Sequence, residues 1–460
     1  MNRPFRARAS RLVAALVGLA ALQSGSAGIR AEDPGFEGAD GLRADDYLTA
    51  EQLRGPHWQV ADAVSNDGFA NTYTITSRFG SWTARGAMQL DLRIREIAAL
   101  EELDRISKSS VFVEAVKRSA VGQVETVASF AAQPVETVKA IPGGVKRWFQ
   151  KTSYQASEVY HDVKIKAAET SEGDSAEGGD SGLDADEAKE LARREALDYL
   201  KISSAERRWY AELGVDPYTD NEVLRRAIRS YSRIEGLTSF GMKFVGLPSI
   251  PGVGAIRKTM TLVWETDPWE LRRRNRKALL EAGISESTAR EFEDQPWLSL
   301  TIQTSLVDSL EALAGVGGRE YLIARALEIG SRDDARLLVQ AVSLLVRYHG
   351  EHEPLAAVLP GVRLPVARTR SGELVATAPA DAFFWTAEMA EAAAGLAELY
   401  GADPATARRL WLVGVASPRF KAESAKRGWE VRDLWRSPDR SAAAAETGHR
   451  GLELRFGRRP

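Results

Sequence analysis

Apolar positions near the start of the chain change from a strand-like spacing to a helical one. Residues 57–85 contain three stretches rich in β-branched and aromatic residues, separated by Asn66-Asp67-Gly68 and Phe79-Gly80. Asparagine and glycine accept positive φ angles at little cost, so both separators are typical of tight turns. Leucine and isoleucine then recur every three or four residues from Leu90 to Ile106. The pattern predicts a small antiparallel β-meander of two or three strands, covered by an amphipathic helix, within residues 32–110.

Residues 188–416 show helical spacing punctuated by capping signals. Ser203–Glu206 and Thr219–Glu222 match the capping box, and Asp267-Pro268 places proline at a first helical position. The run Leu337–Val346 is half the length of a membrane span and indicates a buried helix. One hairpin is expected between residues 363 and 377. The expected fold is therefore mainly α: a capped multi-helix C-terminal domain with one β-hairpin, plus the N-terminal meander on its helix.

Between these regions, residues 111–167 repeat a Val-Glu-Thr-Val motif eleven residues apart, a period that keeps one helix face aligned. We expect an amphipathic helical segment there. Residues 168–187 are acidic, rich in glycine and serine and free of aromatics, which predicts a flexible linker. Residues 417–460 are basic and predict a partly disordered tail, with one docking helix over Gly428–Trp435.

The first residues predict export from the cytoplasm. Four arginines precede the apolar run Leu12–Leu22, and small residues follow. This order is typical of a secretory signal peptide, residues 1–27, with cleavage expected after Ala27. A retained signal anchor is the alternative. We expect the mature protein to be extracytoplasmic, either periplasmic or secreted.

Composition narrows the classes of function. The chain has no cysteine, which excludes disulfides, a disulfide-linked partner, thiolate metal sites and cysteine nucleophiles. The net charge of −3 provides no global attraction to nucleic acid, and we expect no nucleic-acid partner.

Motifs for metal or cofactor chemistry are weak. His349 and His352 lie three apart, but a solvent-exposed helix end explains them better than a metal site. Asp216–Glu222 gathers oxygens without the ligand spacing of a calcium loop. The basic run Arg272–Lys277 is interpreted as a solvated helix face rather than a phosphate site. We expect no metal site and no cofactor, and no catalytic residues can be named.

Aromatic residues are the best candidates for an interaction site, because aromatics dominate binding hot spots as well as cores. The candidates are Trp264, Trp269, Trp297, Trp148 and Phe149, the last two beside a Lys-Arg pair. The favoured hypothesis is a non-enzymatic, exported interaction module that binds a protein or lies on a membrane surface. The alternative is an extracytoplasmic hydrolase that uses a carboxylate pair or a serine without a recognisable motif.

Overall fold

The computed structural model describes six segments of the chain: residues 35–38, 41–118, 202–234, 254–360, 364–400 and 406–433. The chain forms two compact units, residues 1–36 and 37–460, and the elements below belong to the second. The expected signal peptide, the acidic linker, and Trp148 and Phe149 lie outside the described residues. The domain boundaries drawn from the sequence stay predictions.

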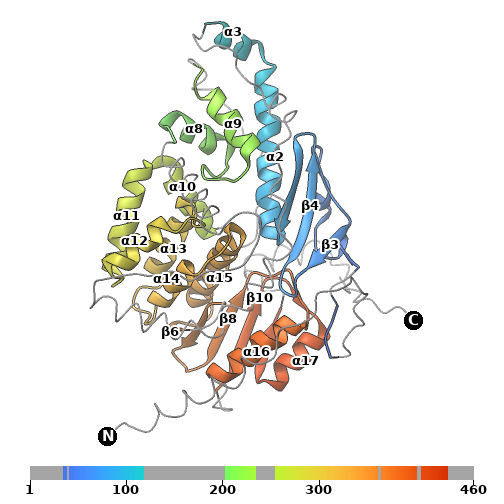
Figure 1. Ribbon diagram of the computed structural model, residues 1–460, viewed down its shortest axis with the longest axis vertical. Helices are drawn as coiled ribbons and strands as arrows, with labels where there is room; N and C mark the ends of the chain where they lie inside the picture. Colours follow the sequence, from blue (N-terminus) through green and yellow to red (C-terminus); the bar gives the residue numbers. More distant parts are fainter. Residues whose placement is uncertain are drawn as a thin grey trace, which may run out of the picture. The chain divides into compact units, whose positions relative to one another are not determined.

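The fold is mixed α/β rather than mainly α. The described residues contain thirteen α-helices and twelve strands, arranged in two five-stranded sheets and one two-stranded sheet (Figure 1). The sequence pattern anticipated the helices and the first sheet but reduced the second sheet to one hairpin. The correction therefore concerns the C-terminal part of the chain.

The N-terminal sheet is antiparallel, as its pattern predicts, and has more strands than expected. It consists of β1 (Leu42–Arg43), β2 (Trp58–Val60), β3 (Ala63–Asn66), β4 (Asn71–Ser77) and β5 (Gly80–Arg85). The first expected stretch divides at residues 61–62 into β2 and β3, which pair with opposite ends of β4. β5 pairs with β4 along its full length, from Gly80 opposite Ser77 to Arg85 opposite Thr72. Short elements η3 (Ala44–Asp46) and α1 (Ala50–Leu53) connect β1 to β2.

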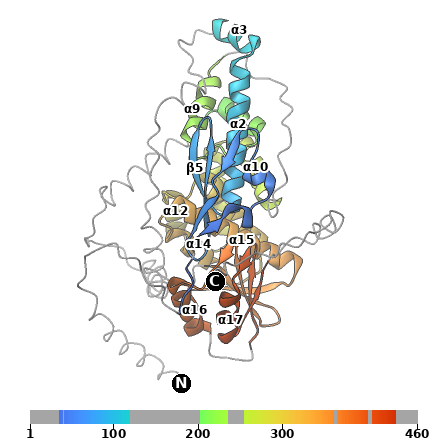
Figure 2. The same cartoon turned by 90° about the vertical axis from the view of Figure 1, so that its right-hand side faces the viewer.

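Helix α2 (Ala87–Ser107) joins two hydrophobic cores. Its first half packs on β4 and β5, where Leu90 and Ile97 are fully buried in the N-terminal core with Tyr73 and Ile75. Its second half enters a middle core, which it shares with α3 (Ser110–Arg118), α8 (Ser204–Leu213) and α9 (Glu222–Tyr231). Helix α9 lies beside α2 (Figure 2). The predicted apolar stripe is confirmed, but its residues are divided between the N-terminal core and the middle core.

A C-terminal core lies around α15 (Arg332–Glu351), whose predicted buried run is confirmed. The helices that build it with α15 are α11 (Pro268–Glu281), α12 (Glu286–Asp294), α13 (Leu300–Ala312) and α14 (Glu320–Leu327). Helix α10 (Gly254–Glu265) packs against α8 and α13 and contributes Val263 to the middle core. Within the described segments, no helix has both the length and the apolar character needed to cross a bilayer.

Most capping predictions hold. Ser203 and Glu206 form the expected capping box of α8, and Asp267 caps α11 with proline in its first turn. The box expected over Thr219–Glu222 is wrong, because Asn221 caps α9 by accepting from the Leu224 N–H. The hydroxyl of Thr219 instead donates a hydrogen bond to Glu96 of α2. It therefore makes a tertiary contact and does not cap a helix.

The second sheet runs in the order β12-β10-β8-β7-β6. Its strands are β6 (Leu355–Leu359), β7 (Val366–Thr369), β8 (Leu374–Ala378), β10 (Arg408–Leu412) and β12 (Trp429–Arg432). The predicted hairpin is present as β7 and β8, while β8, β10 and β12 are parallel. The docking helix expected over Gly428–Trp435 is wrong, since Trp429–Arg432 of this stretch form β12. Helices α16 (Ala387–Tyr400) and α17 (Pro418–Lys426) make the crossovers.

Both faces of this sheet are covered. All five residues of β8 are buried, although neighbouring side chains on a strand point to opposite faces. Thr377 donates to the carbonyl of Ala341 in α15, and α17 packs on β12. Figure 1 shows α16 and α17 on one side of this sheet. β8 is buried on both sides and lacks an alternating pattern, whereas β10 and β12 alternate in burial but are only five and four residues long.

We expect substitution of Leu100 by alanine to destabilise the protein by about 2–5 kcal/mol, because the side chain is fully buried between α2 and the middle core. Leu92 lies on the same helix and is 40% exposed, so Leu92→Ala is the matched control and should cost less than about 1 kcal/mol. Urea denaturation of both variants measures the difference. Equal losses would show that α2 does not carry this core.

Candidate functional site

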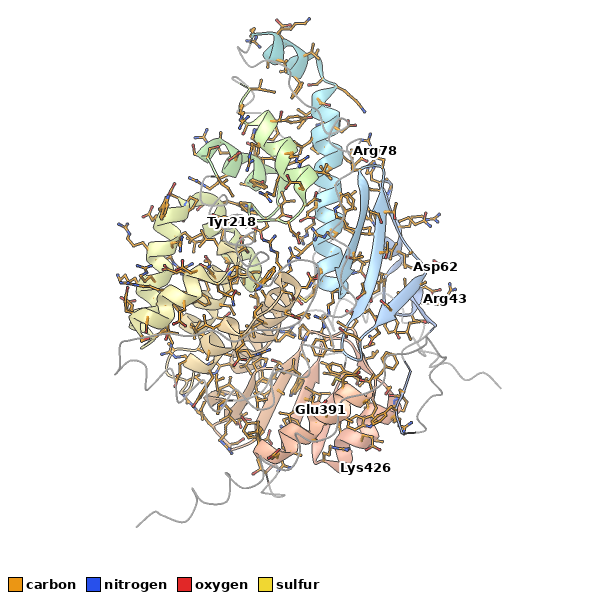
Figure 3. All side chains as sticks on the ribbon, in the orientation of Figure 1. Arg43, Asp62, Arg78, Tyr218, Glu391 and Lys426 are labelled. Atoms are coloured by element: carbon orange, nitrogen blue, oxygen red, sulfur yellow. The ribbon has the colours of Figure 1, made fainter. Side chains whose placement is uncertain are left out.

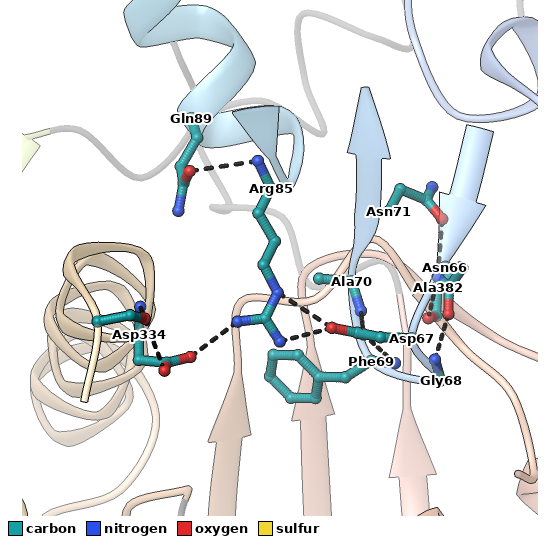
Figure 4. A network of polar contacts seen from close by, with 11 residues as sticks. Asn66, Asp67, Gly68, Phe69, Ala70, Asn71, Arg85, Gln89, Asp334 and Ala382 are labelled. Atoms are coloured by element: carbon teal, nitrogen blue, oxygen red, sulfur yellow. Dashed lines mark hydrogen bonds and ion pairs between the residues drawn. The ribbon is translucent and has the colours of Figure 1, made fainter. Parts of the chain in front are cut away.

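A buried ion network joins the N-terminal sheet to α15. Arg85, at the end of β5, binds Asp67 through Nε and Nη2 at 3.0 and 2.6 Å. Its Nη1 binds Asp334 in the first turn of α15 at 2.8 Å (Figure 4). Only 13% of the Arg85 side chain is exposed. One guanidinium therefore ties together two carboxylates from distant parts of the chain.

Local structure fixes both carboxylates of this network. Asp67 lies in the predicted turn, where its Oδ1 accepts from the N–H groups of Phe69 and Ala70. Asp334 accepts a hydrogen bond from Ser331, the N-cap of α15, at 2.7 Å. Burial opposes the charge of Arg85, but Asp67 and Asp334 outweigh it and raise the pKa of the guanidinium. The arrangement suits a permanent structural tie rather than proton transfer.

Asp381 makes a second tie beside the first. It follows β8, and its Oδ1 accepts from the Ala87 N–H at the start of α2 at 2.9 Å. The N-cap residue of α2 is Gly86, which has no side chain to make this bond. The Oδ2 atom of Asp381 is buried without a hydrogen bond of normal geometry. Burial raises the pKa of Asp381 to about 6, against the lowering effect of the Ala87 N–H.

Amide side chains complete this junction. Asn66 donates to Asn71 at 2.7 Å and to the carbonyl of Ala382 at 3.2 Å, both visible in Figure 4. Asn71 in turn donates to the hydroxyl of Tyr73 at 2.9 Å. The bonds of Asn66 therefore tie the predicted turn to β9 (Ala382–Phe383), which pairs with β11 (Val415–Ala416) in the two-stranded sheet.

A second charged network surrounds Asp220 in the loop between α8 and α9. Arg93 of α2 and Arg336 of α15 both contact its Oδ1, at 2.8 and 3.0 Å. The two arginines overcome the effect of burial and hold the pKa of Asp220 well below its usual value. Glu96, one turn after Arg93, accepts from the hydroxyl of Thr219. The loop is thereby fixed to α2 and α15 at once.

The rest of the Asp216–Glu222 motif is also structural. Thr301 of α13 donates to Asp216 Oδ1 at 2.6 Å, and the N–H of Tyr218 donates to the same atom at 2.9 Å. Tyr218 is fully buried in the middle core (Figure 3). Within the described segments, no group of three acidic or histidine side chains is arranged to hold a metal ion.

The histidine pair closes the end of α15. His349 Nδ1 accepts from the N–H of Leu355 at 2.9 Å, so this nitrogen is used in the connection to β6. The ring of His352 lies against Tyr348 and Trp411, with centroid distances of 5.4 and 4.6 Å. Burial lowers the pKa of His352. Both histidine side chains therefore make contacts that fix the end of α15.

A shallow hollow lies beside the Arg85 network. Phe69, Leu337, Leu338 and Ala341 line it, together with Arg325 and Asp334. Its lining carboxylate, Asp334, is already bound by Arg85 and Ser331. The hollow therefore offers an apolar wall without a free acid or base.

No protein family, characterised protein or solved structure matches this chain.

The three described candidate tryptophans occupy different environments. Trp264 packs against the middle core and donates to the carbonyl of Val215 at 2.9 Å. Trp297 packs against the C-terminal core. Trp269, at the start of α11, is 64% exposed. An interaction role for these residues stays a prediction, and Trp269 is the one that the structure leaves open to a partner.

Trp269 heads an exposed stripe on α11. Arg273, Lys277 and Leu280 follow it at helical spacing, and each is exposed. We call these four residues the α11 face. The guanidinium of Arg272 lies 5.9 Å from the Trp269 ring centroid, within the range of a cation–π contact. The predicted solvated face is present here, while Arg272, Arg274 and Arg276 pair with neighbouring carboxylates.

Replacement of Arg85 by alanine should destabilise the protein by about 3–5 kcal/mol, because it leaves Asp67 and Asp334 buried without a counter-charge. The control is Arg105→Ala, which removes an exposed pair with Glu102 and should cost no more than about 1 kcal/mol. Adding Asp67→Asn and Asp334→Asn to Arg85→Met should recover most of the loss. Chemical denaturation measures the free energy of unfolding of each variant. A loss of about 1 kcal/mol or less for Arg85→Ala would show that the Arg85 ion network does not stabilise the fold.

Asp381 should make stability depend on pH. Its folded pKa of about 6 exceeds the ordinary 3.8, so the folded state binds this proton more tightly. The stabilisation is present below the unfolded value and is lost as pH rises through about 6, by up to about 3 kcal/mol. Asp381→Asn should remove this component and stabilise the protein at pH 7. Denaturation of the unaltered protein and of Asp381→Asn from pH 4 to 7 measures how the unfolding free energy of each depends on pH. The same dependence in both proteins would contradict this prediction.

Proposed function

We propose that this protein is a non-enzymatic, extracytoplasmic interaction module that binds a protein partner through the α11 face. The observation that carries the proposal is Trp269, which keeps 64% of its surface exposed next to Arg272. Tryptophan and arginine are the residues most enriched in binding hot spots. Burial of the exposed indole by a partner supplies a large apolar contribution to affinity.

The charges on this helix favour a protein over a membrane. Glu270 lies 3.8 Å from Arg273, and Glu281 lies 3.7 Å from Lys277, so each exposed cation has an acidic neighbour. An anionic bilayer attracts surfaces with excess positive charge, and this face has little. A mixed polar rim around an aromatic anchor is the usual anatomy of a protein interface. Since the chain has no cysteine, no disulfide links the partner.

Localisation rests on the N-terminal sequence, and peripheral membrane attachment is the competing location. The hydrolase alternative needs a carboxylate pair or a reactive serine that faces a cleft. The carboxylate in the described hollow, Asp334, is bound by Arg85 and Ser331, and this observation does not favour the alternative. We therefore propose the interaction module alone.

A photo-reactive amino acid at position 269 in the native host should cross-link one partner, and Trp269→Ala should weaken binding of that purified partner at least tenfold. Leu399 is a matched control because it is 53% exposed on α16, away from α11. The same label at 399 should give no such product, and Leu399→Ala should leave affinity unchanged. Equal cross-linking from both positions, or unchanged affinity of Trp269→Ala, would refute this surface.

Fractionation of the host separates the two locations. A soluble extracytoplasmic protein supports the proposal, whereas a protein that pellets with membranes and is released by carbonate supports peripheral attachment. Retention of the protein in the cytoplasmic fraction would overturn both.

A further inference from the structure

The carboxyl ends of β8 and β10 form an edge suited to anion binding. These strands are parallel neighbours, and the chain continues from them through β9 and β11 (Val415–Ala416) into α16 and α17. In α/β sheets, ligands bind at this edge, because the helices that follow the strands direct their positive N-terminal ends toward it. Trp385 precedes the first turn of α16, and Ser417 is the N-cap of α17.

A carboxylate of the same chain occupies this edge. Glu37 Oε2 accepts from the backbone N–H of Trp385 at 2.6 Å and from the hydroxyl of Ser417 at 2.6 Å. The Glu37 N–H donates to the carbonyl of Trp385 at 2.9 Å. Glu37 is thereby bound through its backbone and its side chain to residues 348 and 380 positions away in sequence.

The receiving side is built and largely buried. Ser417 is 1% exposed and Trp385 is 3% exposed, whereas Glu37 is only partly covered. Ser417 also accepts from the Phe420 N–H, so its hydrogen is aimed at the carboxylate. The Arg427 guanidinium lies 4.6 Å from the Trp385 ring centroid and holds this ring in place. Both donors, the Trp385 N–H and the Ser417 hydroxyl, are uncharged. Recognition of a carboxylate therefore depends on the length of its side chain and on hydrogen-bond geometry.

We propose that Trp385 and Ser417 form a recognition site for a glutamate in an extended peptide, in which Glu37 is an exchangeable occupant. A glutamate presented by a partner protein takes the same three hydrogen bonds when Glu37 leaves. Tethering in the same chain gives Glu37 a high effective concentration, so it blocks the site until it is displaced. This site follows β9 and β11 of the two-stranded sheet and is independent of the α11 face.

The test uses the full chain with Glu37→Ala and a labelled nonapeptide of residues 33–41, Asp-Pro-Gly-Phe-Glu-Gly-Ala-Asp-Gly. Fluorescence anisotropy should show that the variant binds this peptide at least tenfold more tightly than the unaltered protein does. A peptide with glutamine in place of glutamate should bind at least tenfold more weakly, because a hydrogen bond to a charged acceptor is lost.

Ser417 provides the matched control. In the Glu37→Ala background, Ser417→Ala should abolish binding of the peptide, and Ser417→Thr, which keeps the hydroxyl, should restore it. Denaturation curves check the α17 cap, and Glu37→Gln replaces Glu37→Ala if the latter does not fold. Equal binding of the glutamate and glutamine peptides, or no gain over the unaltered protein, would show that Glu37 is a fixed structural contact and overturn the proposal.

Discussion

Two buried arginine networks hold the N-terminal sheet and α2 against α15. Arg85 binds Asp334 in the first turn of α15, and Arg93 and Arg336 share Asp220. Charges at such depth cost several kcal/mol in desolvation unless they are paired. Any arrangement that separated α2 from α15 would leave them unpaired. The positions of the N-terminal sheet, α2 and the loop between α8 and α9 relative to α15 depend on this constraint.

These networks act together with shared hydrophobic burial. The middle core takes side chains from α2 as well as from α8 and α9, so the parts of the chain before and after residues 119–201 pack into one interior. A chain without cysteine has no covalent cross-link to hold such parts together. Buried ion pairs add directional constraint to the non-directional apolar contacts, which specifies one relative register of α2 and α15.

The two proposed binding sites rest on different elements of this frame. The α11 face belongs to an exposed helix surface, where affinity comes from burial of Trp269. The glutamate site belongs to the edge of a parallel sheet, where Trp385 and Ser417 offer fixed donors. One surface is open, and the other is filled by the chain's own Glu37. A partner can bind the α11 face directly, whereas a partner of the glutamate site must displace Glu37.

Local sequence determined the elements whose stability is local. The turn at Asn66–Gly68, the stripe of α2 and the cap at Ser203 follow from φ preferences, periodicity and hydrogen bonds within four residues. Tertiary structure decided the rest. The hydroxyl of Thr219 donates to Glu96 instead of capping α9, and β8 carries no alternation because all five of its residues are buried. Arg85, Asp381 and Glu37 each bind a partner hundreds of residues away in sequence. No local sequence pattern can predict such pairs.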